Sequence, residues 1–328
     1  MMSIYSKGIR LLYLQRLLEV ETDENHSITM NEIISRLNSY GIPAERKTIY
    51  QDIEILREIG VDIEGKRAGK SFYYSIKSRE FALSEVKLLV DAVRGSKFIT
   101  REKSRELINK LKKFTSKYEG IKLEQEESRN TYIKSDNEEI FDNVEQIHRA
   151  IKENHNIQFQ YFDWTKDKKK VLRHDSAIYN VSPYITIWKN EHYYMVGYDV
   201  KSNMRKNYRI DRMINLGIKN ESRSGKELFE HFSTEKFSSE TYGMFSGEIE
   251  EVCIGFNNKF VNVAIDQFGK DIMMFPNGDD FFTINVKVAI SEQFFGWIFA
   301  LGDGAKIIGP DRVVEQMKRS LCRNYQQY

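Results

Sequence analysis

Residues 45–59 carry side chains of the types that contact nucleic acid. The stretch reads ERKTIYQDIEILREI, and its apolar residues recur at helical spacing along one side. On its other side, the residues with DNA-contacting chemistry are Arg46, Lys47, Thr48, Tyr50 and Gln51. The major groove admits one helix, whose N-terminal side chains reach base edges. We therefore expect Gln51 to pair with adenine, Arg46 or Lys47 to reach guanine or phosphate, and Tyr50 to contact phosphate or a thymine methyl.

A second basic stretch follows directly. Residues 61–76 alternate apolar and polar side chains around the segment GKRAGKS, which predicts a hairpin with Gly65 and Gly69 in turn conformations. The basic residues expected at its tip are Lys66, Arg67 and Lys70. Contacts from such a tip to the DNA backbone or minor groove set affinity and salt dependence more than sequence choice.

The elements before these stretches decide between two interpretations. An isolated amphipathic helix is most often a core helix with a solvated face. Here, however, Thr29 and Glu32 predict a capping box for a preceding short helix, and Gly41-Ile42-Pro43 predicts a tight turn. A short helix, a turn, a second helix and a basic hairpin form the order of a winged helix-turn-helix, so the DNA-contact interpretation is favoured.

Composition neither supports nor excludes this interpretation. The chain has 328 residues, 41% hydrophobic and 30% charged, with a formal net charge of +2, so any case for nucleic acid depends on where the charges lie. No apolar run approaches the ~20 residues that span a bilayer, and the N-terminus lacks a signal-peptide pattern. We expect a cytoplasmic protein without membrane contact.

Catalytic and metal-binding patterns are not found in the sequence. Cys253 and Cys322 are too few for a zinc site, and the six histidines show no metal-ligand spacing. The segment from Gly302 to Gly304 lacks the lysine of a phosphate-binding loop, and no nucleophile-elbow motif occurs. We expect no catalytic residue, no metal, no cofactor and no enzyme activity.

The rest of the chain divides by pattern. Residues 81–118 predict two helices, residues 119–138 a polar irregular linker, and residues 139–155 an amphipathic helix. Several short strands between residues 157 and 218 predict a small barrel, with TKDKKK at a hairpin tip. Residues 248–328 predict a compact α/β module, with Pro310 in the first turn of the last helix.

Several motifs, in this order, are similar to those of bacterial WYL-domain transcriptional regulators. KTIYQDIEILREIG resembles the family's arginine-threonine-isoleucine-tyrosine-arginine-aspartate run, with Lys47 and Gln51 in place of the two arginines. Tyr193-Tyr194-Met195 stands at the tryptophan-tyrosine-leucine triplet, and NYRIDRMINL resembles the phenylalanine-arginine-leucine-aspartate-arginine signature. The C-terminal WIFALGDGAKIIGPDRVVEQMKRSL is similar to the ending of the extension that follows such domains. The resemblance implies a ligand sensor whose suspected ligands are nucleotides or nucleic acids.

Strand alternation gives the expected ligand residues. Tyr194 should lie on the opposite face to Tyr193 and Met195. With Tyr194, the polar and basic residues expected on that face are Ser182, Tyr184, Arg209 and Arg212. Arginine forks suit phosphate, and tyrosine stacks on bases. The alternatives are an internal salt bridge to Asp211 for the arginines and, for Trp188 and Tyr193, a place in the core.

Together these patterns predict an α+β multidomain protein. The predicted parts are a winged helix-turn-helix (1–78), a helical linker region (79–138), a small SH3/Sm-like β-barrel or WYL domain (139–220), a connector (221–247) and a ferredoxin-like α/β extension that dimerises (248–328). The predicted function is a homodimeric transcriptional regulator that binds double-stranded DNA and responds to a nucleotide or single-stranded nucleic acid. The alternative is a nucleic-acid-sensing accessory protein of a phage-defence system that does not act at a promoter.

Overall fold

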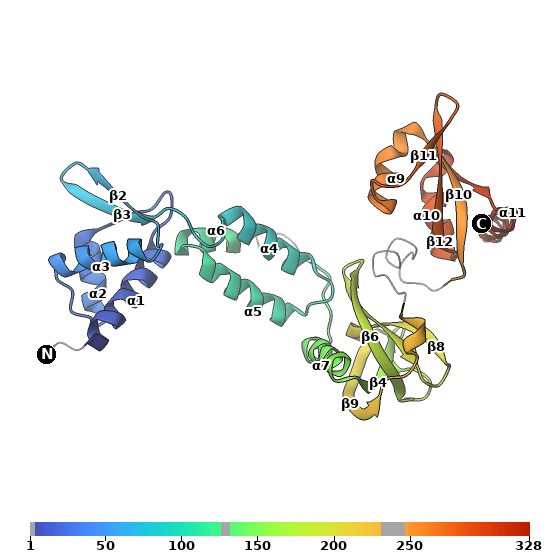
Figure 1. Cartoon of the computed structure of the whole chain (residues 1–328), viewed down its shortest axis with the longest axis horizontal. Coiled ribbons are helices and arrows are strands. Elements are labelled where there is room, and N and C mark those ends of the chain that lie inside the picture. Colours follow the sequence, from blue (N-terminus) through green and yellow to red (C-terminus); the bar gives the residue numbers. More distant parts are fainter. Residues whose placement is uncertain (1–3, 126–131, 231–246) are drawn as a thin grey trace. The chain divides into compact units, whose positions relative to one another are not determined.

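The computed structural model describes residues 4–125, 132–230 and 247–328 (Figure 1). The chain divides into two compact units, Met1–Asp136 and Asn137–Tyr328. Helices and antiparallel sheets occur in both units, which confirms the mixed α and β character predicted from the sequence.

The first unit begins with three helices and a hairpin, the order that the sequence predicts. The elements are α1 (Ile4–Glu21), β1 (Ile28–Thr29), α2 (Met30–Ser39), α3 (Arg46–Glu58), β2 (Ile63–Ala68) and β3 (Ser71–Ile76). The strands form an antiparallel sheet in the order β1-β3-β2. We call this part, residues 4–76, the head.

Local sequence explains where α2 begins and ends. The Thr29 hydroxyl accepts a hydrogen bond from the Glu32 amide, and the Glu32 carboxylate accepts one from the Thr29 amide, so the predicted capping box is present. After the helix, Gly41 adopts a φ of +73°, a left-handed conformation that glycine enters without a steric penalty. The turn into α3 starts here.

A buried ion pair ties α1 to α3 inside the head. Asp52 is fully buried on the apolar side of α3, beside Ile49 and Ile53. The Arg10 guanidinium donates two hydrogen bonds to its carboxylate, at 2.5 and 3.2 Å, and the Arg10 side chain is 12% exposed. An acidic residue within a core stripe requires such a partner, because a lone buried charge is strongly unfavourable.

Three helices follow the head: α4 (Leu83–Gly95), α5 (Arg101–Leu111) and α6 (Lys117–Gln125). The first two match the helices predicted at residues 81–118. The third corrects the prediction of an irregular linker from residue 119, up to the end of its described part. Leu123 of α6 is 3% exposed and packs with Val86 and Ile108, so a single apolar anchor holds a helix whose periodicity is too weak to detect.

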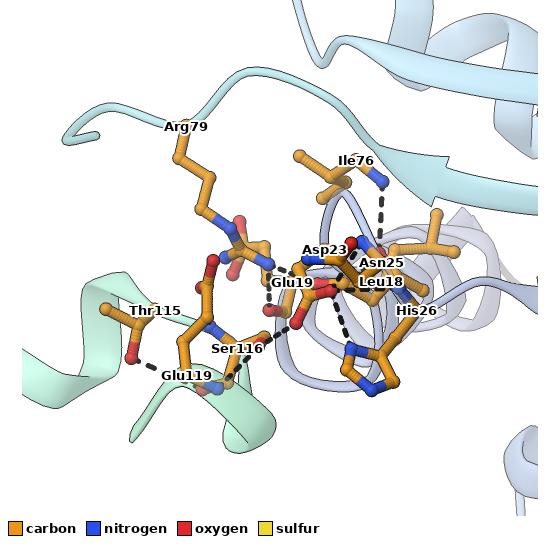
Figure 2. A network of polar contacts seen from close by, with 11 residues as sticks. Leu18, Glu19, Asp23, Asn25, His26, Ile76, Arg79, Thr115, Ser116 and Glu119 are labelled. Carbon is orange, nitrogen blue, oxygen red and sulfur yellow. Dashed lines mark hydrogen bonds and ion pairs between the residues drawn. The ribbon is translucent and has the colours of Figure 1, made fainter. Parts of the chain in front are cut away.

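Asp23 joins the head to the helices that follow (Figure 2). Its carboxylate accepts hydrogen bonds from the backbone amide and ring Nδ1 of His26, at 2.9 and 2.7 Å, and from Ser116 Oγ at 2.5 Å. The His26 ring stacks on Tyr118 of α6 at 3.7 Å, and Arg79 donates to the carbonyls of Glu19 and Thr22. We call this cluster the Asp23 junction.

The second unit contains α7 (Ile140–Glu153) and a curled antiparallel sheet. Its strands are β4 (His155–Trp164), β5 (Lys170–Leu172), β6 (Tyr179–Lys189), β7 (His192–Asp199), β8 (Met204–Arg209) and β9 (Met213–Ser222). They follow the order β5-β4-β6-β7-β8, with β9 paired along β4. The predicted tip TKDKKK lies between β4 and β5, as expected.

The C-terminal part of the second unit has its own core. Its elements are β10 (Ile249–Asn257), α9 (Val261–Phe268), β11 (Met274–Asn277), β12 (Phe281–Ala289), α10 (Glu292–Ala300), β13 (Ala305–Gly309) and α11 (Asp311–Tyr325). The strand order β11-β12-β10-β13 gives an antiparallel sheet with β-α-β-β-α-β connectivity. Pro310 is the N-cap of α11, one position before the first-turn site that the sequence predicts.

Candidate nucleic-acid interface

The first candidate surface is the outer side of α3. Arg46, Lys47 and Gln51 are exposed, Thr48 is half-buried and the Tyr50 side chain is 42% exposed. Their opposite neighbours in the helix fill the core of the head. The first turn is further positioned by Arg46, whose Nη2 donates a hydrogen bond to Asn31 Oδ1 of α2 at 2.5 Å.

Tyr50 connects this helix to the hairpin. Its hydroxyl makes a side-chain hydrogen bond with Tyr74 of β3, which is only 3% exposed. Burial, followed by the interactions with Tyr50, raises the pKa of Tyr74 to about 12. The Tyr74 phenol is therefore neutral at physiological pH, and its contact with Tyr50 fixes the Tyr50 side chain while the outer part of that side chain stays in solvent.

The three basic residues of the hairpin do not share one face. Strand alternation places Arg67 on the side that carries Ile63 and the residues facing α3, whereas Lys66 lies on the other side. On that other side Lys66 and Tyr73 line a pocket of about 360 Å³ with the loop at residues 23–27. Lys70 lies in the turn beside Gly69, whose φ is +60°.

Gly65 differs from its predicted role. It lies inside β2 opposite Tyr74, and not in a turn. A Cβ atom at this position would lie 2.4 Å from Cε1 of Phe72. The glycine therefore lets the Phe72 ring lie close to the backbone of β2, a role that cannot be distinguished from a turn by composition alone.

The cations of this surface lack acidic partners. Within the described parts of the chain, no carboxylate lies within 4.0 Å of the ammonium or guanidinium group of Lys47, Lys66, Arg67 or Lys70. Two nearby acids are engaged elsewhere: Glu54 pairs with Arg57 at 2.7 Å and Glu64 with Lys77 at 3.7 Å. These four positive charges are thus available to an anionic partner.

The second candidate site lies in the curled sheet, and the structure divides its predicted residues into groups. Ser182 is fully buried, donates to Asn156 Oδ1 at 2.6 Å and accepts from the Ser224 amide at 2.9 Å. The Tyr184 hydroxyl donates to the Ser224 carbonyl at 3.0 Å. The Tyr184 ring stacks on Phe229 at 3.9 Å with the Arg223 guanidinium 4.5 Å from its centroid. Both residues therefore hold the segment after β9 against β6.

Tyr194 lies in an apolar environment. It is 8% exposed and packs with Ile187 and Val196, covered by Phe229. Alternation predicted one polar face for β7, but the strand lies between β6 and β8, and Tyr194, Met195 and Val196 are all buried. Burial raises the pKa of the Tyr194 phenol.

Arg209 pairs with Asp211, the alternative considered from the sequence. Its Nε and Nη2 donate to the two carboxylate oxygens at 3.1 and 2.7 Å, and Nη2 lies 3.1 Å from Nδ1 of His192. Burial alone would lower the pKa of Arg209, but the bonds to Asp211 outweigh it and the pKa is raised. The Arg209 side chain keeps 26% exposure, so one edge of the pair faces solvent.

Arg212 shares a different carboxylate with Arg173. Arg212 Nη1 and Arg173 Nη2 each donate to Asp163 Oδ1 at 3.0 Å. The Arg173 guanidinium lies 5.0 Å from the ring centroid of Tyr161, whose hydroxyl accepts a hydrogen bond from the Arg209 amide. The hydrogen bonds from Arg173 are the main cause of the lowered pKa of Asp163. Three arginines and two carboxylates thus surround Tyr161.

Sequence reasoning missed several members of this cluster. Asp163 lies between Phe162 and Trp164 in β4, and only the pairing of β4 with β5 brings Arg173 to it. Arg223, after β9, is placed by the chain there and donates to the Pro183 carbonyl beside Tyr184. Trp188 was expected in the core, yet it is 50% exposed and lies beside Tyr193 with ring centroids 5.8 Å apart.

Across residues 4–125, 132–230 and 247–328, no group of three or more His, Cys, Asp or Glu side chains is arranged to hold a metal ion. None of the helices in these ranges has the length and apolar character needed to cross a membrane.

Comparison with known proteins identifies one segment. Residues 142–218, from α7 to β9, match the family model described as the WYL domain. Among solved structures, proteasome accessory factor B/C (PafBC) of Arthrobacter aurescens is 15% identical, with 98% of this chain and 49% of that chain covered and a TM-score of 0.30. A CRISPR Cas-related protein is 13% identical, with coverages of 98% and 83% and a TM-score of 0.36. The chain thus spans about half the length of the PafBC chain. No curated protein sequence matches it.

Proposed function

Because this chain contains a WYL domain, we propose that it is a ligand-responsive, DNA-binding transcriptional regulator. The head would act as a winged helix-turn-helix, with α3 in the major groove and the β2–β3 hairpin as the wing. The observation that supports this most is the set of exposed cations without acidic partners on α3 and the hairpin. An elongated polyanion is the partner that such a surface fits.

The proposed roles within α3 follow from position. Gln51 is exposed one turn into the helix and has the donor and acceptor pair that adenine requires. Lys47 and Arg46 precede it and would take phosphate or guanine. The wing cations Lys66, Arg67 and Lys70 would contact the backbone, with Lys66 and Arg67 on opposite faces of the hairpin.

The WYL domain, taken as a small SH3/Sm-like barrel, would carry the ligand site. The arginines around Tyr161 support a ligand with phosphate groups, a nucleotide or a short single strand, since arginine binds phosphate through a planar fork. Such a ligand would have to replace the carboxylates that now pair with these arginines. The molecule would act as a homodimer through its C-terminal ferredoxin-like extension, since two heads on a two-fold site read more sequence than one.

The test is binding of the purified full-length chain to a duplex that covers the DNA upstream of its own gene. Wild type should protect a discrete segment in a footprint. The Lys47→Ala/Gln51→Ala variant should lose roughly 10- to 100-fold in affinity, since a bidentate base contact contributes about 1–3 kcal/mol. The matched control is Lys201→Ala/Gln327→Ala, which makes the same changes at exposed positions outside the head and should bind as wild type does.

Two other outcomes would contradict this proposal. Binding that is equal for upstream and unrelated duplexes, and equal in both variants, would favour an accessory nucleic-acid sensor over a promoter-binding regulator. Absence of any duplex binding by the wild type would remove the proposed role of the head.

A further inference from the structure

One face of the hairpin continues the surface of α3 to the hairpin tip. Pairing in β2 and β3 sets Ile63 opposite Ile76, Gly65 opposite Tyr74 and Arg67 opposite Phe72. Residues two apart in a strand share a face, so these pairs form one row. The exposed fraction rises toward the hairpin tip: Ile76 is 4% exposed and Tyr74 3% exposed, whereas Phe72 is 41% exposed.

The Phe72 ring, at the exposed end of this row, packs against Gly65 and Tyr74. Its ring lies over Gly65, where a Cβ atom would approach Cε1 to 2.4 Å. Its centroid lies 5.1 Å from that of Tyr74, with the rings tilted by 51°. One side of the ring is thus supported by protein while a large part stays in solvent. An aromatic ring held in this way loses little conformational entropy when it contacts a partner.

The same row reaches α3 through Tyr50. Tyr50 bonds to Tyr74, as described above, and is itself 42% exposed. Exposed rings therefore stand at the two ends of this row, Tyr50 on α3 and Phe72 near the tip, with the buried Tyr74 between them. Arg67 lies directly opposite Phe72 in the hairpin. We call Tyr50, Tyr74 and Phe72 the aromatic row.

We propose that Phe72 is a further DNA-contact residue, whose ring packs against the sugars of the minor groove next to the major-groove segment that α3 occupies. This inference rests on the proposed function of the head. The walls of the minor groove present apolar sugar surface below a rim of phosphates. An aromatic ring beside an arginine matches this arrangement, because the ring takes the sugar surface and Arg67 takes the phosphate. Proteins that bind the minor groove commonly combine these two side-chain types.

Scattered exposed apolar residues are common on protein surfaces and need no function. Phe72 differs in its combination of features: the glycine under its ring, the arginine in register with it, and the contact of its ring with the buried Tyr74, whose other neighbour is Tyr50 of α3.

The experiment measures affinity by fluorescence anisotropy over a series of KCl concentrations, with the full-length chain and two labelled duplexes. One duplex covers the DNA upstream of the gene and the other has the same length and mixed sequence. Phe72→Ala should weaken binding to the upstream duplex roughly fivefold to twentyfold while the slope of log K against log[salt] is unchanged. Arg67→Ala should reduce the magnitude of that slope by about 0.9, the value for one phosphate contact.

Two further variants control for structure. Tyr73→Ala removes the neighbouring aromatic ring on the opposite face of the hairpin and should bind within about twofold of wild type. Gly65→Ala leaves every proposed contact group in place but displaces the Phe72 ring, and should cause a loss between those of Tyr73→Ala and Phe72→Ala. If Phe72→Ala lowers the melting temperature, Phe72→Leu, which keeps apolar volume, replaces it in the comparison and should retain part of the affinity.

The outcomes separate this inference from the proposed function. A wild-type chain that binds neither duplex overturns both. If wild type binds and Lys47→Ala/Gln51→Ala does not, while Phe72→Ala equals Tyr73→Ala, the function stands and the inference is wrong. A Phe72→Ala variant whose salt slope falls as that of Arg67→Ala does would also overturn the inference, because Phe72 would then act by positioning the arginine.

Discussion

The head and the WYL domain both present basic side chains, but they treat those charges in opposite ways. In the head, Lys47 and Arg67 are exposed and have no acidic partner within 4.0 Å among the described residues. The ion pair between Arg10 of α1 and Asp52 of α3 lies in the interior of the head. In the WYL domain, Arg209 and Arg212 lie near the surface and each is paired with a carboxylate.

This difference has an energetic meaning. A polyanion that meets the head displaces only counterions, so binding there depends on salt and needs no rearrangement of the protein. An anion that meets the WYL cluster competes with Asp163 and Asp211, so it must offer more than charge. A site of this kind favours ligands that make several contacts. Binding of such a ligand would separate the arginines from their carboxylates, and this change in pairing gives the bound and free states different contacts.

The largest effect on stability is expected at Asp52, in the buried pair of the head. Asp52→Ala would leave the Arg10 guanidinium, 12% exposed, without its partner, and should lower the free energy of unfolding of the head by about 3–5 kcal/mol. Hydrogen exchange of the amides of α1 and α3 in the full-length chain measures the effect. Glu54→Ala, on the same helix but in an exposed pair, should cost less than about 1 kcal/mol. Equal effects of the two substitutions would show that burial does not distinguish the pairs.

A second carboxylate, Asp199, gives the WYL domain a pH dependence. Burial alone would raise its pKa, but hydrogen bonds from Tyr208 and Lys206 dominate and hold the pKa at about 2, below the ordinary 3.8. Because the folded-state pKa is depressed, this stabilisation is present above pH 4 and is lost as the pH falls from about 4 toward 2. Asp199→Asn should therefore cost about 2 kcal/mol at pH 7.

The measurement is urea unfolding of wild type and Asp199→Asn at pH 7, 4 and 3, followed by tyrosine and tryptophan fluorescence. The difference between the two chains should narrow across the acidic range. A difference that stays constant from pH 7 to pH 3 would contradict the role given to the ionised carboxylate.

Asp211 should show an intermediate effect. It is 9% exposed and accepts two hydrogen bonds from Arg209, so Asp211→Asn should lower the free energy of unfolding by roughly 1.5 kcal/mol. Thermal melting of the full-length chain detects this change. A loss as large as that of Asp52→Ala would make the Arg209 pair a core element and argue against a ligand role for Arg209.

Asp163 should give the smallest change in stability and the clearest change in binding. The carboxylate is 42% exposed, so Asp163→Asn should cost less than about 1 kcal/mol. The substitution releases Arg173 and Arg212 and should strengthen binding of a mixed-sequence single-stranded oligonucleotide by up to about fivefold. Anisotropy of the labelled oligonucleotide measures it, with Asp167→Asn in the β4–β5 turn as control. If the affinity is unchanged, single-stranded nucleic acid is not a ligand of these arginines, and only the head would be left as a nucleic-acid surface.

Local features of the fold were predictable because their causes are local. The Thr29–Glu32 capping box, the left-handed Gly41 and the amphipathic side of α3 each depend on residues within a few positions of one another. The α/β character of residues 248–328 is also predicted from the pattern of the sequence, although α10 (Glu292–Ala300) is not among the helices that periodicity gives. By contrast, α6 is not predicted, because Leu123 is the one buried apolar side chain among the described side chains of the helix.

The site residues show where sequence reasoning ends. The exposed side of α3 could be inferred, since its opposite side is apolar. The partner of Asp52 lies 42 positions away, and Arg173 meets Arg212 only through the pairing of the sheet. Alternation does not show that the central strand β7 is covered on both sides, so the burial of Tyr194 is not predicted, although Tyr194 does lie opposite Arg209 in β8. Long-range pairing, and not residue type, separates these cases.

The Asp23 junction also has a practical consequence. A fragment that stops at residue 78, where the sequence places the end of the winged part, would remove Ser116 from the Asp23 carboxylate and Tyr118 from the His26 ring. It would also delete Arg79, which caps carbonyls at the end of α1. An expression boundary after α6, at Gln125 or beyond, retains all of these partners, and it is therefore the better boundary for a fragment that contains the head.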